Sequence, residues 1–361
     1  MTSFAERTMR LFPRTAVDFA FWLLAILPLL LLASFVAVLV SVQSARAEET
    51  AACKGNNIIE TLRANDPAAY QRVVDEAART PNGKGNFWKI EKQGVSPSFL
   101  MGTMHVTDPR VLAMSPAAKQ AHAGADTIVI ESDEILDEKK AAAALLMKPE
   151  LTMFTDGTTI SKLLSAKDAE TLASGLKARG IALPLVDRMK PWMIASFVAL
   201  PACEVQRKAD GAAFLDKKLA EDALAMGKQV KGLETLAEQL SAMAELPVEF
   251  HLQALIETIK IGDRMNDVIE TMTDLYLSGD TGMTLPMLKT VSPEDSGDDA
   301  GSYAAFEQRI IIDRNHVMAE RAGPLLAKGN VFIAVGALHL PGADGLVELL
   351  RKQGFTVTAV N

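Results

Sequence analysis

The chain has 361 residues, of which 49% are hydrophobic, 23% charged and 6% aromatic. This composition excludes a disordered, a collagen-like and a small disulfide-rich protein, and the length is sufficient for a large hydrophobic core. The 37 Lys and Arg residues against 45 Asp and Glu residues give a net charge of −8. With no basic run interleaved with aromatic residues, the sequence argues against a nucleic acid as partner.

An uncharged apolar segment near the start predicts export. Residues 19–42 carry no charge and are long enough to cross a bilayer as one helix. Arginines at positions 7, 10 and 14 precede the segment and Ala45-Arg46-Ala47 follows it, which is the pattern of a secretory signal cleaved after Ala47. An uncleaved anchor is the alternative, because the segment exceeds the roughly 7–15 residues usual for a signal core.

Either form exports the remainder, since the positive flank stays inside. We therefore expect a periplasmic or secreted protein, or one anchored in the inner membrane with its domain outside the cytoplasm. In such an oxidising compartment the only two cysteines, Cys53 and Cys203, suggest one disulfide. Two buried free thiols are the alternative.

Short apolar runs predict an α/β layer at each end of the exported part. After a polar lead-in over residues 48–85, the elements expected in chain order are strands at Phe87–Glu91 and Ser98–Met101, a helix at Ser115–Ala123 and a strand at Thr127–Ile130. Near the C-terminus they are a strand at Val331–Val335, a helix at Asp344–Gln353 and a strand at Phe355–Val360.

Between about residues 136 and 325 the periodicity is mainly helical, with Leu215, Leu219 and Ala223 spaced by four, and with one further strand end near Val230. The predicted fold class is therefore α/β: a mixed sheet flanked by helices, with a large, mainly helical insertion between the N- and C-terminal sheet-forming parts. The predicted organisation is a signal segment over 1–47, the lead-in over 48–85 and one domain over 86–361.

Two segments, 99–105 and 333–339, share the pattern of an apolar triplet, Gly, a small residue, an apolar residue and His. With 23 glycines and five histidines, about 0.3 matches to Gly-x-x-His are expected by chance. Such a strand brings His105 or His339 to the sheet edge where α/β proteins bind ligands. For either histidine alone, a hydrogen-bonded structural role is the alternative. The other three histidines are expected on solvated helix faces: His122, His251 and His316.

Carboxylates follow two of the expected strands in the same way. Glu131 comes directly after Thr127–Ile130, and Glu234 after Val230–Leu233. Two imidazoles and a carboxylate are the ligand set of a catalytic divalent metal with an open water position or, without metal, a base and its orienting partner. For Glu131, an acidic cap of a following helix is the alternative.

Arg314 lies in a row of apolar residues spaced by four on a helix expected at Tyr303–Ala322. An arginine in that row points inward and needs an anionic partner. Candidates are Glu131, Glu234 or the negative charge that develops on a substrate carbonyl. An arginine that reaches the surface along its apolar stem is the alternative.

These motifs resemble the TraB/GumN family of exported bacterial proteins, to which the animal Tiki proteins are related. The matching blocks, over about residue 87 to the C-terminus, are Gly102-x-x-His105, Glu131, Leu215-Asp216, Gly232 to Gln239, Tyr276-x-x-Gly279-Asp280, Arg314-Asn315-x-x-Met318-Ala319 and Val335 to Gly342. Leu338 departs from the small residue, often glycine, usual before the last histidine.

The resemblance implies a pair of histidines and an acidic residue at the edge of an α/β sheet, in a fold similar to that of erythromycin esterases and a group of haem-binding lipoproteins. Tiki proteins are peptidases that depend on a divalent metal. We therefore expect His105, His339 and Glu131 to bind a divalent metal, with the identity open among Mn, Co and Zn. Arg314 would stabilise an oxyanion, and Glu234 is a second catalytic candidate.

The expected reaction is hydrolysis of an amide or related acyl bond in a peptide or small acyl substrate. Two alternatives stay open. One is a non-catalytic periplasmic protein that binds haem, metal or a peptide in the same crevice, and the other is an accessory factor in envelope polysaccharide production.

Overall fold

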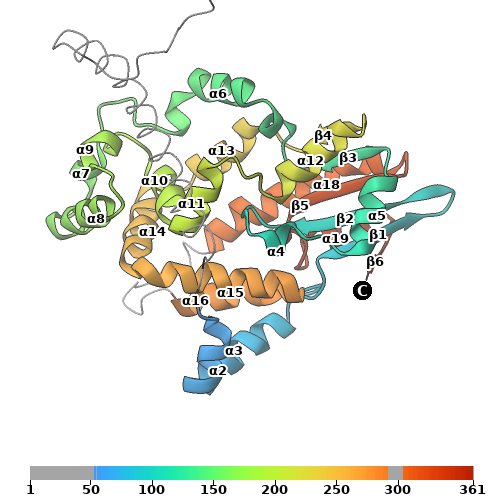
Figure 1. The fold of residues 1–361 in the computed structure, drawn as a ribbon, viewed down its shortest axis with the longest axis horizontal. Coiled ribbons are helices and arrows are strands. Elements are labelled where there is room, and N and C mark those ends of the chain that lie inside the picture. Colours follow the sequence, from blue (N-terminus) through green and yellow to red (C-terminus); the bar gives the residue numbers. More distant parts are fainter. Residues whose placement is uncertain (1–52, 54, 292–303, 361) are drawn as a thin grey trace, which may run out of the picture. The chain divides into compact units, whose positions relative to one another are not determined.

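The computed structural model describes residues 53, 55–291 and 304–360 (Figure 1). The apolar segment at 19–42 lies outside these residues. Within them, none of the helices combines the length and the apolarity that crossing a bilayer requires.

Six strands form one mixed sheet in the order β4-β3-β5-β2-β1-β6. The strands are β1 (Phe87–Lys92), β2 (Val95–Thr103), β3 (Thr127–Ile130), β4 (Gln229–Gly232), β5 (Val331–Gly336) and β6 (Thr356–Ala359). Strands β4, β3, β5 and β2 are parallel, whereas β1 is antiparallel to both of its neighbours. The predicted α/β fold with a mixed sheet is thus confirmed, and every strand expected from the sequence is present.

The helices fall between and around these strands. Before β3 lie α2 (Ile58–Asn65), α3 (Pro67–Ala78), α4 (Pro109–Leu112) and α5 (Pro116–Gly124). Between β3 and β4 lie η1 (Asp133–Leu136), α6 (Glu138–Met147), η2 (Pro149–Leu151), α7 (Ile160–Leu163), α8 (Ala166–Ala178), α9 (Leu183–Val186), α10 (Pro191–Val198), α11 (Ala202–Ala209) and α12 (Leu215–Ala225).

Between β4 and β5 lie α13 (Leu236–Ala244), α14 (Val248–Ile261), η3 (Gly262–Arg264), α15 (Met265–Ser278), η4 (Thr281–Met283), α16 (Thr284–Val291), the π-helical η5 (Glu307–Ile312) and α18 (Asp313–Leu326). The last two helical elements are η6 (Ala337–His339) and α19 (Leu346–Lys352).

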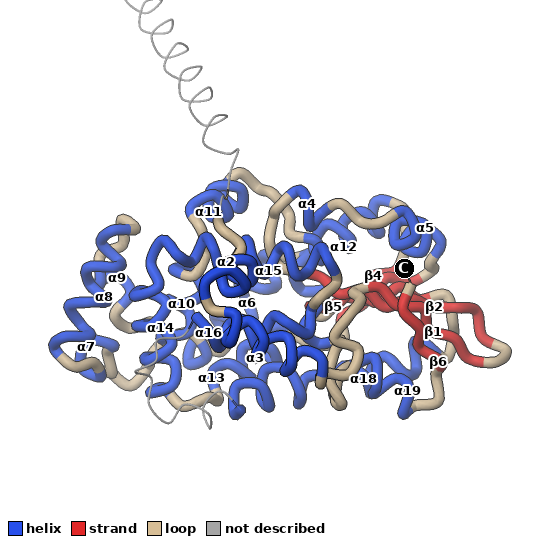
Figure 2. The backbone as a smooth tube through the Cα atoms, turned by 90° about the horizontal axis from the view of Figure 1, so that it is seen from below, coloured by secondary structure: helices blue, strands red, loops and turns tan. Residues whose placement is uncertain are grey.

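Helices cover both faces of the sheet (Figure 2). On one face α4, α5 and α12 pack against Phe332 and Ala334 of β5. On the other, α18 and α19 pack against Val331, Ile333 and Val335 of the same strand. Because side chains alternate along a strand, a run that is apolar at every position fits only a strand buried on both faces.

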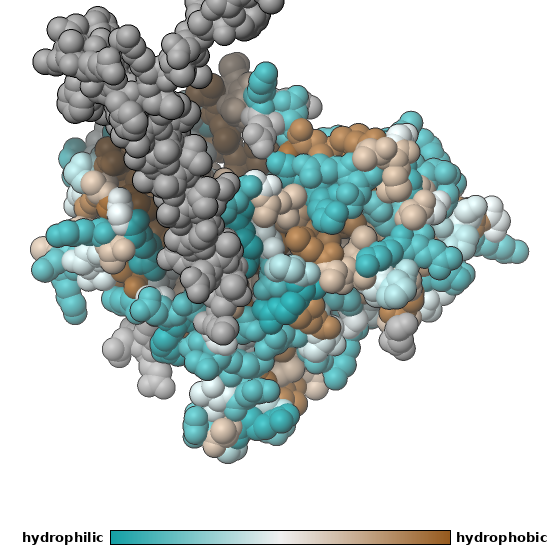
Figure 3. All heavy atoms as spheres, viewed as in Figure 1, coloured by the Kyte–Doolittle hydropathy of each residue, from teal (hydrophilic) through white to brown (hydrophobic). Residues whose placement is uncertain are grey.

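The mainly helical part has two further cores. One joins α7, α8, α10 and α14 around Leu172, Leu176 and Leu255. The other joins α2 and α3, which lie in the predicted lead-in, to α15 and α16 around Val73 and Met287. Hydrophilic residues predominate on the outer surface of α2 and α3 (Figure 3), as expected for helices with one buried face.

The predicted disulfide is confirmed. Cys53 and Cys203 are bonded, with their Cα atoms 5.5 Å apart. The bond ties the start of the described chain to α11, across 150 residues of sequence. In the chain-entropy model, closing a loop of this length raises the free energy of the unfolded chain by about 4–5 kcal/mol.

The predicted solvated positions of His122 and His251 are wrong. Both side chains are buried. In each, Nε2 forms a hydrogen bond with a backbone carbonyl, Leu219 O at 3.0 Å and Met243 O at 2.8 Å. Burial lowers the pKa of both imidazoles, so both are neutral structural residues. His316 is exposed, as expected.

Glu238 supports the helix that follows β4. Its side chain accepts from the backbone N–H of Thr235 at 2.8 Å, while Thr235 Oγ1 accepts from the N–H of Glu238, so the two form a capping box on α13. Arg321 of α18 donates to both Glu238 oxygens, at 2.7 and 2.9 Å. These bonds, Arg321 first, lower the pKa of Glu238 from its ordinary 4.5 to about 2.

Glu238→Gln should destabilise the protein by about 1 kcal/mol at pH 7, since it weakens a cap and a half-exposed ion pair. The folded-state pKa is depressed, so this contribution is present above the unfolded value and is lost as the pH falls from about 4.5 toward 2. Urea denaturation between pH 7 and pH 2.5 measures it. A constant difference from wild type over that range would contradict the assignment, and Glu150→Gln on exposed η2 controls for the lost charge.

Candidate functional site

Polar residues follow all four parallel strands at one edge of the sheet. His105 comes two residues after β2, Glu131 directly after β3, Glu234 two residues after β4, and His339 three residues after β5. Parallel strands end at the same edge, so residues far apart in sequence meet there. The structure thereby brings together all the residues that the sequence singled out for a site, including Arg314 of α18.

The two repeated glycines allow this close approach. Strands β2 and β5 pair in register, with Gly102 opposite Val335 and Thr103 opposite Gly336. A Cβ on Gly102 would lie 3.0 Å from the Cα of Ala337, and one on Gly336 would lie 3.1 Å from Glu131 Oε1. A side chain at either position would push its neighbours apart by a few tenths of an ångström, so glycine suits both strand ends.

A third acidic residue completes the cluster. The ligand atoms of His105, Glu131 and Asp216 all lie within 4.8 Å of one another. Asp216 is buried on α12, and its Oδ1 accepts a 2.8 Å hydrogen bond from Thr103 Oγ1. Its Oδ2 is buried with no hydrogen-bond partner among the described residues, and lies 3.5 Å from His105 Nε2. A buried acceptor in this state indicates a cation or other donor at this point.

His105 lies at the solvent side of the cluster, with 56% of its side chain exposed. Its ring lies against Phe214, with ring centroids 5.2 Å apart. Desolvation opposes the charged imidazole, but the carboxylates of Asp216 and then Glu131 outweigh it and raise the pKa of His105 to about 9.

His339, in contrast to His105, is held in the neutral protonation state. Its Nδ1 lies 2.7 Å from Asn315 Oδ1, and Asn315 Nδ2 donates to the carbonyl of Asp344 at 2.9 Å. Because that amide nitrogen is committed as a donor, Oδ1 is the acceptor and the proton of His339 sits on Nδ1. Burial lowers the pKa of His339 to about 4, so the ring is neutral at pH 7.

The free lone pair of His339 Nε2 faces Glu131. The two acceptor atoms, Nε2 and Glu131 Oε1, are 3.8 Å apart. Two acceptors that face each other leave room between them for a hydrogen-bond donor or a cation. Metal–ligand distances of about 2.0–2.2 Å permit ligand atoms separated by up to about 4 Å, so a divalent cation fits this pair.

Glu131 is fixed by donors on every side. Its Oε1 accepts from the backbone N–H of Gly336 at 2.7 Å, and its Oε2 accepts from Arg314 Nη2 at 2.7 Å and from Gln239 Nε2 at 3.0 Å. Desolvation opposes the carboxylate, but the two imidazoles, Arg314 and the Gly336 amide outweigh it and lower the pKa of Glu131 to about 2. This group is therefore ionised at any pH near neutrality.

Arg314 points inward, as the sequence predicts, and joins two carboxylates. Its Nη2 donates to Glu131 and to Glu234, each at 2.7 Å, and its Nε donates to Glu234 at 3.1–3.2 Å. Of the three anionic partners expected from the sequence, the structure shows these two. The π-helical η5 ends two residues before Arg314, and such segments are frequent at functional sites.

Sequence analysis did not single out Asp216, Asn315 and Gln239 as site residues. The sequence could have indicated Asp216, because this residue belongs to the buried face of α12. That face is formed by Leu215, Asp216, Leu219, Ala220 and Ala223. A charged residue in such a stripe indicates a buried polar partner.

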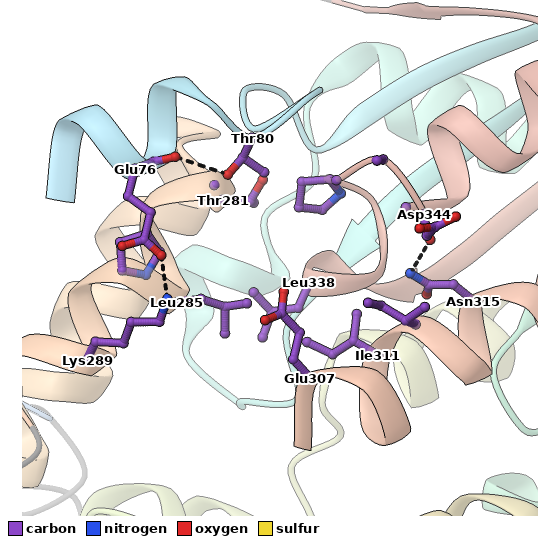
Figure 4. A pocket seen from close by; sticks show the side chains of 17 residues that line it. Glu76, Thr80, Thr281, Leu285, Lys289, Glu307, Ile311, Asn315, Leu338 and Asp344 are labelled. Carbon is purple, nitrogen blue, oxygen red and sulfur yellow. Dashed lines mark hydrogen bonds and ion pairs between the residues drawn. The ribbon is translucent and has the colours of Figure 1, made fainter. Parts of the chain in front are cut away.

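A pocket of about 240 Å³ adjoins the site at Asn315 (Figure 4). Leu338 and Ile311 contribute apolar wall, and the ion pair of Glu76 with Lys289 lies in the lining. Leu338, where the family resemblance leads us to expect a small residue, thus lines this pocket rather than the space between His339 and Glu131.

Comparison with known proteins finds a matching family model and several relatives. The sequence model of the TraB/PrgY/gumN family matches residues 86–359. Relatives include the "Metalloprotease TIKI homolog" of Nematostella vectensis, 25% identical over 330 residues, which are 79% of this chain and 69% of the relative.

Two further relatives carry the same kind of name. "Metalloprotease TIKI2" of Danio rerio is 23% identical over 335 residues, 81% of this chain and 64% of the relative. "Metalloprotease TIKI1" of Homo sapiens is 23% identical over 315 residues, 75% of this chain and 61% of the relative. The chain thus spans about two thirds of the length of these relatives. No solved structure matches it.

Gly336→Ala should destabilise the protein by about 1–3 kcal/mol, because the added methyl group pushes against Glu131 and the ring of His339. Gly124→Ala is the matched control, since a Cβ at this last residue of α5 meets nothing within 4 Å. Urea denaturation of the two variants measures the difference. Equal stability would show that the space around Gly336 is not restricted.

Proposed function

Since the chain belongs to the TraB/PrgY/gumN family, we propose that it is an exported, metal-dependent hydrolase that cleaves amide or related acyl bonds, as a peptidase does. The single observation that carries the proposal is the cluster of His105, Glu131 and Asp216, with a buried, unsatisfied carboxylate oxygen facing the imidazole. The names of the relatives support the same chemistry. The disulfide supports an exported location.

The residues present fit a divalent cation. Three buried carboxylates, those of Glu131, Asp216 and Glu234, are accompanied by the guanidinium of Arg314 and the half-exposed imidazole of His105. Even with His105 charged, the negative charges of these groups exceed the positive ones, and a divalent cation would compensate them. We propose that His105, Glu131 and Asp216, whose ligand atoms are mutually close, hold the ion, and that His339 adds a further ligand on the Glu131 side. These oxygen and imidazole ligands suit Mn, Co or Zn. When bound, the ion lowers the pKa of a coordinated water and polarises a substrate carbonyl.

The protein's own residues prepare the site for this chemistry. Asn315 keeps the proton of His339 on Nδ1, so that Nε2 offers its lone pair. Arg314, Gln239 and the Gly336 amide hold Glu131 ionised and oriented. Preorganised groups of this kind need no rearrangement when a substrate reacts.

We assign Arg314 to positioning the two glutamates. Its Nε and Nη2 are already engaged with Glu131 and Glu234, and its Nη1 donates to the Ile310 carbonyl at 3.4 Å. For an oxyanion, the role expected from the sequence, this leaves one N–H of Nη1. Glu234 then holds Arg314 in place. His105, exposed at the edge of the cluster, is where a substrate gains access to the ligand set.

The first test is divalent-ion binding by residues 48–361 purified from the periplasm. We expect the wild type to bind one Mn²⁺, Co²⁺ or Zn²⁺, and His105→Ala or Asp216→Asn to weaken binding at least about 100-fold, since each removes a ligand. His316→Ala is the control, because that histidine is exposed outside the cluster. Titration calorimetry measures the affinities, and absence of binding by the wild type would exclude a metal centre.

Hydrolysis is tested separately with fluorogenic peptides and acyl esters. Activity that disappears on chelation, returns with the added ion and is lost in His105→Ala would support the hydrolase. Stoichiometric ion binding without turnover of any substrate would favour the non-catalytic ligand-binding alternative.

Asn315→Ala tests the support of His339. We expect metal affinity to fall about 10–100-fold, because the imidazole loses the acceptor that fixes its orientation. Nitrogen NMR shifts of His339 should change from one defined tautomer to a mixture. Unchanged shifts would show that Asn315 does not determine the tautomer.

A further inference from the structure

One short helix contacts both ends of the segment that carries His105. This segment, residues 105–107, leaves the sheet after β2 and leads to α4. Helix α11 (Ala202–Ala209) lies against it, although the two are separated by about one hundred residues of sequence. A histidine on an irregular segment, with an exposed ring, depends on such outside support for its position.

Glu204 of α11 binds the far end of the segment. Its side chain is buried, and its Oε2 accepts from the backbone N–H of Thr107 at 2.9 Å and from Thr107 Oγ1 at 2.8 Å. Arg207 donates to Thr107 Oγ1 at 3.0 Å and to Glu204 Oε1 at 2.5 Å. The Thr107 hydroxyl therefore has both a donor and an acceptor partner, which fixes its rotamer.

Lys208 of α11 binds the near end, where its Nζ lies 3.4 Å from the carbonyl oxygen of His105. The helix itself is fixed by the disulfide, because Cys203 is one of its residues. Arg207 Nη2 also donates to Cys53 Sγ at 3.1 Å. The covalent bond and the contacts to the His105 segment thus share two successive turns of one helix.

We propose that α11 positions His105, that Glu204 acts through Thr107 as a positioning residue, and that the Cys53–Cys203 bond holds α11 in the required place. This inference rests on the proposed function, since it takes His105 as a metal ligand. A buried ion pair contributes little net stability compared with apolar residues of the same size. Apart from the bond from Arg207 to Cys53, the described contacts that this pair makes with other residues are with Thr107, which a role in orientation explains.

The experiment compares Thr107→Val, Thr107→Ser and Glu204→Gln with wild type in residues 48–361. Thr107→Val removes the hydroxyl that Glu204 and Arg207 share, and Thr107→Ser keeps it. Gln206→Ala is the matched control on the same helix, since its amide binds only Asp210, the C-cap of α11, among the contacts described. Thermal melts and circular dichroism verify the fold of each variant.

We expect the His105 imidazole resonance of the metal-free protein to shift in Thr107→Val and Glu204→Gln, and the Thr107 amide to exchange with solvent at least ten-fold faster in Glu204→Gln. The Mn²⁺ dissociation constant should rise at least five-fold in both. Thr107→Ser and Gln206→Ala should resemble wild type. The double variant Cys53→Ser, Cys203→Ser should reproduce the shift of His105 while the core stays folded.

An unshifted His105 resonance in Thr107→Val and Glu204→Gln would overturn the proposal, whether or not the protein binds Mn²⁺. A shifted resonance with unchanged Mn²⁺ affinity would overturn it too, because the position of His105 would not matter for the ion. Wild-type protein that binds no ion would instead refute the metal centre, and the metal-free resonance would still decide whether α11 positions His105.

Discussion

The bidentate and bridging contacts of Arg314 are the interaction on which the site depends. One guanidinium joins the residues that follow β3 and β4 to a helix on one face of the sheet. Without it, Glu131 and Glu234 would be two buried carboxylates that lack this shared countercharge. With it, Glu131 remains ionised and keeps a fixed orientation toward both histidines.

The two histidines of the repeated motif are chemically different although their sequence settings are alike. His339 is buried and neutral, with its tautomer set by Asn315, whereas His105 is half exposed and favours its charged form beside Asp216. The difference arises from what packs on each strand end, α18 on one and the loop before α12 on the other. In the proposed metal centre, a cation that binds both histidines would therefore displace a proton only from His105, the exposed one.

Local pattern predicted most of the fold and part of the site. The runs Ile128–Ile130 and Val331–Val335 are apolar and buried at every position, which is typical of a strand buried on both faces. The histidines and Glu131 followed from those strand ends. Asp216 and Asn315 did not, because helical periodicity shows which face is buried but not which charge that face will meet. The predictions for His122 and His251 were wrong for the same reason. Each imidazole lies on an inner helix face and forms a hydrogen bond with a carbonyl of another helix, which the sequence of one helix does not reveal.

The place of β5 in the sheet determines when the candidate site can assemble. This strand inserts between β2 and β3, which are made some two hundred residues earlier. The edges of β2 and β3 that face β5 therefore have no partner strand until β5 has been made, and contacts of such long sequence separation form slowly. His339 and the Gly336 amide reach Glu131 only with that strand. A nascent chain that has not reached β5 accordingly lacks the assembled cluster, so the proposed activity requires the sheet with β5 in place.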